Sequence, residues 1–358
     1  MVNQEKVQDA LRAVIDPDLH RDIVSLGFVQ NLKVHDNRVA FTLKLTTPAC
    51  PVKDELKQQA EEVVRAIPGV MAVEVEMTAE VRPNPGASGL AMLPGVKNII
   101  PIASGKGGVG KSTVSANLAV ALRLTGASVG LLDADIYGPS IPTIMGTTEL
   151  PKPGGKKIQP VIAHGVPVIS SGFFIQPGQA VVWRGPMLAK MVEQLLGGVE
   201  WGELDYLIID LPPGTGDVQL TLCQRIPLTG AVIVTTPQPV AVNIAEKAIV
   251  MFNQLKTPIL GVIENMSYFE SSKTGEREHI FGAGGADRIS QKWEFPVLGK
   301  IPLATTVRET SDGGRPIVLD DPQSPAAIAF TECAKNLAAQ ISIRNIRAQA
   351  DDLVNITF

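Results

Sequence analysis

The chain has 358 residues, of which 45% are apolar and 19% are charged, and its formal net charge is −4. Lysine and arginine are interspersed with acidic residues, which argues against the clustered basic surface of a nucleic-acid binder. The sequence lacks both a run of about 18 apolar residues that would span a membrane and the opening layout of a signal peptide. Its three scattered cysteines are too few for a disulfide framework. We therefore expect a cytoplasmic protein with neither nucleic acid nor a membrane among its partners.

The first block of the chain has the pattern of a small α+β domain. Val39, Phe41, Leu43 and Leu45 alternate with polar or small residues, which is the period of a half-buried strand. Pro51 stands near the start of a helical stretch, where its missing N–H costs little. In chain order we expect a helix, two strands, a helix and a last strand, at residues 3–15, 29–34, 39–46, 51–66 and 72–77.

A stretch rich in proline, glycine and serine, Arg82–Gly89, separates two blocks of different pattern. Such a composition is typical of an exposed connection between domains. We therefore predict an α+β domain, a linker, a larger α/β domain and a tail, at residues 1–81, 82–96, 97–345 and 346–358.

After the linker, short apolar runs alternate with helical stretches such as 114–124 and 243–255. Continuous apolar strands joined by crossover helices are typical of a parallel sheet that is covered on both faces. The pattern predicts a doubly wound, mostly parallel α/β domain. Its seven expected strands end near Ser104, Asp133, Ser170, Asp210, Thr236, Glu264 and Gly299.

The strand expected at residues 98–104 runs directly into a glycine-rich loop, and Ser112 opens a helix. Strand, glycine loop and helix in this order are the context of a phosphate-binding loop. Glycines allow the backbone to wrap phosphates, and the N–H groups at a helix N-terminus supply partial positive charge. The sequence thus predicts Mg·ATP binding by Gly105, Lys106, Gly107, Gly108, Val109, Gly110, Lys111, Ser112 and Thr113.

Individual polar residues have expected roles around this loop. Lys111 is expected to reach the β- and γ-phosphates, Ser112 to offer its hydroxyl to Mg²⁺, and Thr113 to bond the α-phosphate. Asp210 ends an apolar strand in the manner of a carboxylate that holds Mg²⁺ through water. Asp133 and Asp135 end another apolar run, and either carboxylate could act on magnesium-bound or attacking water. For Asp133, a plain helix cap is the alternative.

With these pieces in place, the sequence resembles the deviant Walker A ATPases, a group that includes MinD, ParA and the nitrogenase iron protein. The resemblance rests on residues 105–111, where the extra signature lysine of the group falls on Lys106. It implies a homodimer in which Lys106 contacts the phosphates bound by the partner. It also implies that Asp135 positions the attacking water and that Asp210 begins switch II. The catalytic residues implied are Lys106, Lys111, Asp135 and Asp210.

A narrower resemblance, to the Mrp/ApbC family of iron–sulfur cluster carriers, rests on residues 133–140, 210–217 and 264–267. It implies that Asn265 hydrogen-bonds the adenine. Residues 46–51 are similar to the SufT-like domain that is often fused to these ATPases. The resemblance implies a slow, Mg-dependent ATPase that assembles clusters, of the 4Fe–4S type, and transfers them to apo-proteins. Cluster assembly factors are further partners that it implies.

The chain departs from this family at the position of the cluster ligands. Many Mrp-type carriers have a C-x-x-C pair soon after the Asn-Met-Ser segment, whereas residues 268–275 contain no cysteine. The candidate ligands are Cys50, whose thiol pKa the N-terminus of the next helix is expected to lower, and Cys223, which follows switch II. An ordinary buried thiol is the alternative for both. Cys333 shares a helical face with apolar residues, which predicts a core position.

Two other functions compete with the carrier hypothesis. One is a MinD- or ParA-like positioning or regulatory switch without a cluster. Residues 341–358 would be its surface anchor, but their two arginines are balanced by two aspartates, and such an anchor usually has a basic polar face. The other is a reductase with an interfacial cluster, like the iron protein, but the cysteine spacing that this protein has after switch II is missing here.

Overall fold

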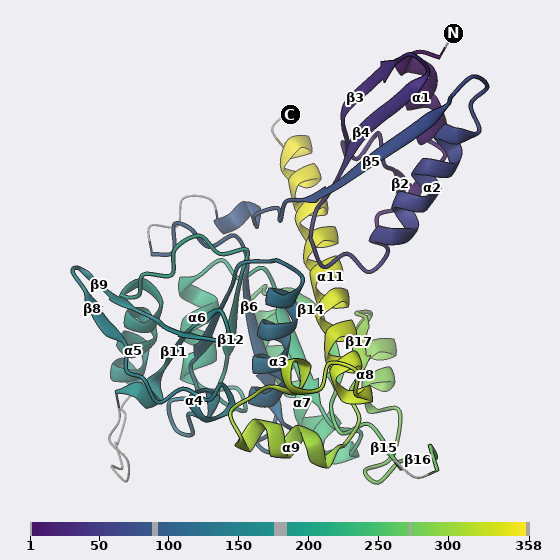
Figure 1. Ribbon diagram of the computed structural model, residues 1–358. Helices are drawn as coiled ribbons and strands as arrows, with labels where there is room; N and C mark the ends of the chain where they lie inside the picture. The colour runs from purple at the N-terminus through teal and green to yellow at the C-terminus, as the bar shows by residue number, and fades with distance from the viewer. Residues whose placement is uncertain (1, 88–91, 175–184, 272–273, 356–358) are drawn as a thin grey trace. The chain divides into compact units, whose positions relative to one another are not determined.

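The computed structural model describes residues 2–87, 92–174, 185–271 and 274–355, which fold into two compact units (Figure 1). The first comprises Met1–Arg82 together with Ser342–Phe358, and the second comprises Pro83–Ile341. Residues 88–91 of the expected linker and 356–358 of the expected tail lie outside the described residues. Among the described residues, no helix is both long and apolar enough to cross a membrane.

The N-terminal part of the first unit contains a three-stranded sheet in the order β3-β4-β5, with β3 antiparallel and β5 parallel to β4. The alternating side chains of β4 that the sequence places on one face, from Val39 to Leu45, are buried in a core with the two helices. The elements expected here are present, but the first helix ends at Leu11 and not at residue 15, because Ile15 belongs to a short hairpin, β1 with β2, that was not expected. Their bounds are α1 Gln4–Leu11, β1 Ile15–Asp16, β2 Arg21–Asp22, β3 Val29–His35, β4 Arg38–Leu45, α2 Lys53–Arg65 and β5 Ala72–Ala79.

The last helix, α11 (Pro325–Asn355), contributes its end to this first unit. The hydroxyl of Ser342 donates to the hydroxyl of Thr46 at 2.5 Å, and the side-chain amide of Asn345 donates to the carbonyl of Arg82 at 2.9 Å. The structure therefore differs from the expected division, in which a tail begins at residue 346, because the helix continues without interruption to Asn355.

The second unit is built on an eight-stranded sheet in the order β10-β11-β7-β12-β6-β13-β14-β17. Its strands are parallel except for β10, which is antiparallel to β11. The doubly wound, mostly parallel fold class is confirmed, and β10 is an eighth strand beyond the seven expected. The strands are β6 Ile99–Ser104, β7 Val129–Asp133, β10 Val161–Ala163, β11 Val166–Ser170, β12 Tyr206–Asp210, β13 Ala231–Thr235, β14 Ile259–Glu264 and β17 Val297–Lys300.

Helices cover both faces of this sheet (Figure 1). Apolar residues of α5, α6, α7 and α8 share one core with one face, whereas α3 packs against β6, β7 and β12 with α10 beside it. Smaller elements complete the unit. They are two hairpins, β8 (Lys152–Gly154) with β9 (Lys157–Gln159) and β15 (Phe269–Glu270) with β16 (Arg277–Glu278), and two short 3-10 turns. The helices are α3 Lys111–Leu124, α4 Ile141–Ile144, α5 Gly185–Gly197, α6 Asp217–Arg225, α7 Pro239–Gln254, α8 Gly285–Trp293, α9 Thr305–Asp312 and α10 Ile317–Asp320.

The strand order brings the expected polar residues together. The parallel neighbours β11, β7 and β12 end in register, so that Ser170 pairs with Asp133 and Asp133 with Asp210. The strand β6, on the other side of β12, ends at Ser104 and leads into the glycine loop. Ligands of open α/β sheets bind at this carboxyl edge of the strands.

Candidate functional site

The glycine loop connects β6 to α3 and has the backbone geometry that only glycine adopts easily. Gly108 and Gly110 have φ angles of 78° and 79°, in the left-handed region. Gly105 is required for another reason: a Cβ there would lie 2.4 Å from the backbone nitrogen of Ala245 in α7. The glycines therefore shape the loop itself and allow it to pack closely against α7.

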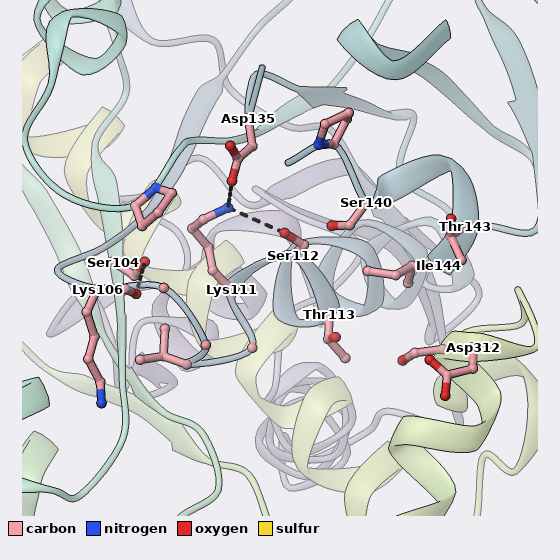
Figure 2. Close-up of a pocket in the computed structure, with 17 residues that line it drawn as sticks. Ser104, Lys106, Lys111, Ser112, Thr113, Asp135, Ser140, Thr143, Ile144 and Asp312 are labelled. Atoms are coloured by element: carbon pink, nitrogen blue, oxygen red, sulfur yellow. Dashed lines mark hydrogen bonds and ion pairs between the residues drawn. The ribbon is translucent and has the colours of Figure 1, made fainter. Parts of the chain in front are cut away.

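A cavity of about 440 Å³ opens on this loop (Figure 2). The predicted loop residues line it, except Gly105, and so does Asp135. Its far wall was not predicted and comes from α4 and from the end of α9. The lining residues outside the loop are Ser104, Asp135, Pro139, Ser140, Thr143, Ile144, Pro213, Ser311 and Asp312.

The carboxylate of Asp210 gathers three side chains from the start of α3. The ammonium of Lys111 lies 2.8 Å from it, and the hydroxyls of Ser112 and Ser115 each donate to it at 2.6 Å. Sequence reasoning missed Ser115, although its position three residues after Ser112 places both hydroxyls on one helical face. The structure thus brings together the predicted residues Lys111, Ser112 and Asp210.

These residues fit a magnesium ion. The hydroxyl of Ser112 and the carboxylate of Asp210 are hard oxygen donors, the type that Mg²⁺ takes together with phosphate oxygens. The adjacent loop exposes successive backbone N–H groups and a helix N-terminus, which suit anionic phosphates. The arrangement can therefore hold a magnesium–nucleotide complex with the phosphates at the loop.

Asp135 faces the same position from the segment that follows β7. Its Oδ2 atom lies 4.0 Å from Nζ of Lys111, and Figure 2 shows the two side chains pointing toward one another. Burial raises the pKa of Asp135, and the charge of Lys111 opposes this shift. A carboxylate with a raised pKa is a better acceptor of a proton from water than an ordinary one.

Asp133, the other candidate, is fully buried and does not line the cavity. It accepts hydrogen bonds from the backbone N–H groups of Asp135 and Ile141 and from the hydroxyl of Ser170. Burial, and next the charge of Asp210, raise the pKa of Asp133 to about 7. Its contacts are with the protein, so it has no direct access to a bound water or nucleotide in the cavity.

The side chains of Lys106, within the loop, and of Asn265 form hydrogen bonds outside the Lys111–Asp210 cluster. Lys106 extends away from Lys111 in Figure 2, and its Nζ donates to the side chain of Gln238 at 3.2 Å. The amide of Asn265 donates to the carbonyl of Val109 at 2.8 Å, and Asn265 does not line the cavity. The role of Asn265 in binding adenine stays a prediction.

None of the three cysteines lines this cavity. Burial raises the pKa of Cys50 to about 11, opposite to the expected lowering, because desolvation outweighs the hydrogen bond from the backbone of Val52. Cys223 is half-buried on α6, and burial raises its pKa as well. Cys333 is fully buried, so its predicted core position is confirmed, and burial raises its pKa to about 12. Within the described ranges, no group of three or more His, Cys, Asp or Glu could hold a metal ion.

The position where many carriers have the C-x-x-C pair forms a small hairpin, β15 (Phe269–Glu270) with β16 (Arg277–Glu278). Residues 272–273 lie outside the described residues. The guanidinium of Arg277 lies 2.7 Å from the carboxylate of Glu270 and 4.4 Å from the ring centre of Tyr268. An ion pair and an aromatic contact therefore hold this hairpin together.

Family models match both parts of the chain. Residues 4–77 match a model described as an iron–sulfur cluster assembly protein. Residues 95–338 match the ParA model, described as the NUBPL iron-transfer P-loop NTPase. The chain belongs to this P-loop NTPase family. The predicted resemblance to iron–sulfur carrier ATPases with a fused N-terminal domain is thereby confirmed.

Curated members of the family match over almost the whole chain. The iron–sulfur cluster carrier protein of Synechocystis is 46% identical over 349 residues, which cover 96% of this chain and 99% of that protein. The iron–sulfur cluster carrier protein of Escherichia coli K12 is 40% identical, with 95% of each chain covered. The chloroplastic Fe-S cluster assembly factor HCF101 of Arabidopsis thaliana is 44% identical over 98% of this chain, but the match spans 66% of that longer protein.

Solved structures agree with the fold of the family. A nucleotide-binding protein from Archaeoglobus fulgidus, solved in complex with ADP, is 42% identical, with a TM-score of 0.57 over 66% of this chain and 92% of that one. The septum site-determining protein MinD from Pyrococcus horikoshii, complexed with Mg-ADP, has a TM-score of 0.51 and 24% identity over 66% of this chain and 94% of that one. The second likeness shows the fold alone.

Proposed function

We propose that this protein is an ATP-binding and ATP-hydrolysing iron–sulfur cluster carrier, which assembles clusters and passes them to apo-proteins. The observation that carries the ATPase part is the convergence of Lys111, Ser112 and Ser115 on the buried carboxylate of Asp210, beside a glycine loop. The carrier part is supported by relatives that match almost the whole chain and are named iron–sulfur cluster carrier proteins.

The residues of the cavity have distinct roles in the proposed hydrolysis. The loop N–H groups and Lys111 bind the β- and γ-phosphates, and Ser112 and Asp210 would hold Mg²⁺, which supplies charge compensation on the phosphate oxygens. Asp135 orients a water molecule and accepts its hydrogen as the water oxygen attacks the γ-phosphorus and the bond to ADP breaks. The rate should be slow, because catalysis of this kind depends mostly on positioning and electrostatic stabilisation.

We propose further that the active form is a homodimer with ATP between the subunits. Lys106 is half-buried and points away from the phosphate side of its own loop, where its Nζ bonds Gln238. This orientation supports the role of Lys106 in reaching phosphates bound by a second copy. Nucleotide binding would close the dimer, and hydrolysis would reopen it.

The cluster, of the proposed 4Fe–4S type, is the cargo of this cycle. Iron–sulfur clusters are held by thiolates, and four is the usual number. Cys50 and Cys223 are the proposed ligands, because both are partly accessible while Cys333 is fully buried. A dimer would supply each of them twice. Apo iron–sulfur proteins and cluster assembly factors are the proposed partners.

ATP hydrolysis is tested first, by phosphate release from the full chain with Mg²⁺. The wild type should hydrolyse ATP slowly. Asp135→Asn should keep nucleotide binding and lose at least about 100-fold in kcat, since it removes the group that orients water. Lys106→Ala should bind nucleotide as a monomer but neither dimerise with ATP nor hydrolyse it. A wild type without Mg-dependent hydrolysis would reject the ATPase proposal.

Cluster binding is tested by anaerobic reconstitution with iron and sulfide, followed by iron quantitation and transfer to an apo-ferredoxin. Cys50→Ser and Cys223→Ser should each lower the bound iron if the residue is a ligand. Cys333→Ser is the matched control, because its thiol is buried in the core, and it should load like the wild type. Equal loading of all three variants would exclude these cysteines as ligands. If the wild type binds no cluster, the carrier proposal is rejected, and the alternative of a MinD- or ParA-like regulatory switch without a cluster is favoured.

A further inference from the structure

Asp133 connects the segment beside the nucleotide site to the neighbouring strand β11 through three hydrogen bonds. Its Oδ1 atom accepts the backbone N–H of Asp135 at 3.1 Å. Its Oδ2 atom accepts the backbone N–H of Ile141 at 3.2 Å and the hydroxyl of Ser170 at 2.9 Å. One fully buried carboxylate therefore holds both ends of the segment 135–141 against the sheet.

These contacts differ from those of a plain helix cap. A cap residue directly precedes its helix and accepts an N–H from the second or third helical residue. Asp133 instead accepts the N–H of Ile141, the first residue of α4, from eight positions upstream, and α4 has only four residues. It also bonds Asp135, which lies outside the helix. The bonds of Asp133 thus fix a loop at its two ends.

The segment held in this way carries the proposed water-orienting group. Asp135 lies 4.0 Å from Nζ of Lys111, and its Oδ1 atom accepts the N–H of Gly138 at 3.3 Å within the same segment. The backbone of Asp135 is tied to Asp133, so the direction of the Asp135 carboxylate depends on that bond. A displacement of about 1 Å at a reacting group can cost on the order of 100-fold in rate.

The charge of Asp133 is not needed to stabilise the sheet. Asp210, its neighbour on β12, is neutralised by Lys111, but among the residues that the structure describes no lysine or arginine forms an ion pair with Asp133. A buried carboxylate that is compensated only by N–H and O–H dipoles costs free energy, and a second carboxylate nearby adds to the cost. An apolar side chain at this position would avoid that cost, but it could not form the hydrogen bonds to the 135–141 segment. Those hydrogen bonds are therefore what Asp133 contributes.

We propose that Asp133 is a positioning residue for ATP hydrolysis, which fixes Asp135 and the start of α4 at the nucleotide site, and that Ser170 on β11 holds Asp133 in place. The inference rests on the proposed ATPase function and deepens it. Asp133 acts through Asp135 and does not touch the nucleotide.

The test compares Asp133→Asn and Ser170→Ala with a matched control, Asp205→Asn. The carboxylate of Asp205 also accepts a backbone N–H, from Ser128 at 2.9 Å, and unlike Asp133 it forms an ion pair, with Lys97 at 2.9 Å. Asp205 lies just before β12, at the end of that strand opposite to Asp210. We expect Asp133→Asn to bind ATP with a Kd within about threefold of the wild type and to lower kcat about 10- to 100-fold. Ser170→Ala should lower kcat about threefold, and Asp205→Asn should leave it unchanged.

Hydrogen exchange of the amides of Asp135 and Ile141, in the nucleotide-free protein, gives a second reading that needs no hydrolysis. Asparagine keeps only one acceptor oxygen, so Asp133→Asn should speed the exchange of at least one of these two amides about tenfold, and Asp205→Asn should speed neither. Wild-type kcat or wild-type exchange in Asp133→Asn would overturn the inference. If that variant does not fold, Ser170→Ala decides by the same two measurements.

Failure of the proposed function gives a different result. In that case the wild type hydrolyses no ATP, but Asp133→Asn still speeds amide exchange in the 135–141 segment. This result would reject the proposed ATPase function, and Asp133 would remain the group that fixes the segment.

Discussion

The ammonium group of Lys111 lies 2.8 Å from the carboxylate of Asp210, and the two side chains are 6% and 0% exposed. The pair joins the first residue of α3 to the last residue of β12, so it links the glycine loop to the segment that follows β12. A buried ion pair contributes little net stability, but removal of one partner leaves an uncompensated charge in the interior. The order of the loop before nucleotide binds therefore depends on this pair.

Lys111→Ala should destabilise the protein as well as abolish ATP hydrolysis. We expect the free energy of unfolding to fall by about 3 kcal/mol at pH 7, because Asp210 is left buried without its cation. Urea denaturation measures this. Lys106→Ala is the control: its half-buried side chain bonds the neutral Gln238, so its loss should cost about 1 kcal/mol or less. Equal stability of the two variants would contradict the prediction.

Two glycines of the loop should respond differently to alanine. A Cβ on Gly105 would meet the backbone of Ile244 and Ala245 at 2.4 Å, so Gly105→Ala should lower the free energy of unfolding by about 3 kcal/mol. A Cβ on Gly107 would have its nearest neighbour, Pro213, at 4.0 Å, so Gly107→Ala should unfold like the wild type. Thermal unfolding of both variants checks this, and a large loss at Gly107 would show that the loop is packed differently.

The raised pKa of Asp133 predicts a pH dependence of stability. Burial and the charge of Asp210 raise it from 3.8 to about 7. The protonated form therefore favours the folded state, so this contribution is complete below about pH 4 and is lost as the pH rises through about 7. The free energy of unfolding of the wild type minus that of Asp133→Asn should be larger at pH 5 than at pH 8. The change should not exceed about 1.4 kcal/mol per pH unit in this window.

Urea denaturation of both proteins at several pH values measures this difference. The variant lacks the titrating carboxyl of Asp133, so the subtraction reports the pH dependence that this carboxyl adds in its native surroundings. A difference that stays constant, or that grows with pH, would contradict the raised pKa.

The thiols should react slowly in the folded protein. Burial raises the pKa of Cys50 to about 11, so its alkylation by iodoacetamide at pH 8 should be on the order of 100-fold slower than that of free cysteine. Cys333 should react only after unfolding, because it is fully buried. Mass spectrometry of the alkylated peptides separates the sites. Cluster loading should likewise improve as the pH rises from 7 to 9, since thiolates are the iron ligands.

Much of the fold and of the phosphate site could be predicted because the signals are local. The apolar runs before Ser104, Asp133 and Asp210 mark strand ends directly, and the glycine loop lies between one of these strands and its helix. The short strand β10 could not be predicted in this way, since its three residues carry no period. The turn between β10 and β11, His164-Gly165, has two positive φ angles. A residue pair that ends in glycine is typical of such a turn, so it was the sequence signal that could have revealed this hairpin.

Features that depend on distant segments could not be predicted. The bond from Asn265 to Val109 joins residues 156 positions apart, and the wall of the cavity at Asp312 comes from a helix near the end of the chain. The pKa of Cys50 shows the same limit. Its place before a helix is visible in the sequence, but burial by the core of the unit outweighs the helix terminus, and burial depends on tertiary packing.

The end of α11 has a consequence for the order in which the chain is made. Residues Met1–Arg82 leave the ribosome before the P-loop unit, but their compact unit also contains Ser342 and Asn345, which bond Thr46 and Arg82. Newly made polypeptide emerges from its N-terminus, and domains made early generally fold early. Here most of the first unit is translated before the P-loop unit, but its last helical segment is translated only after the whole P-loop unit.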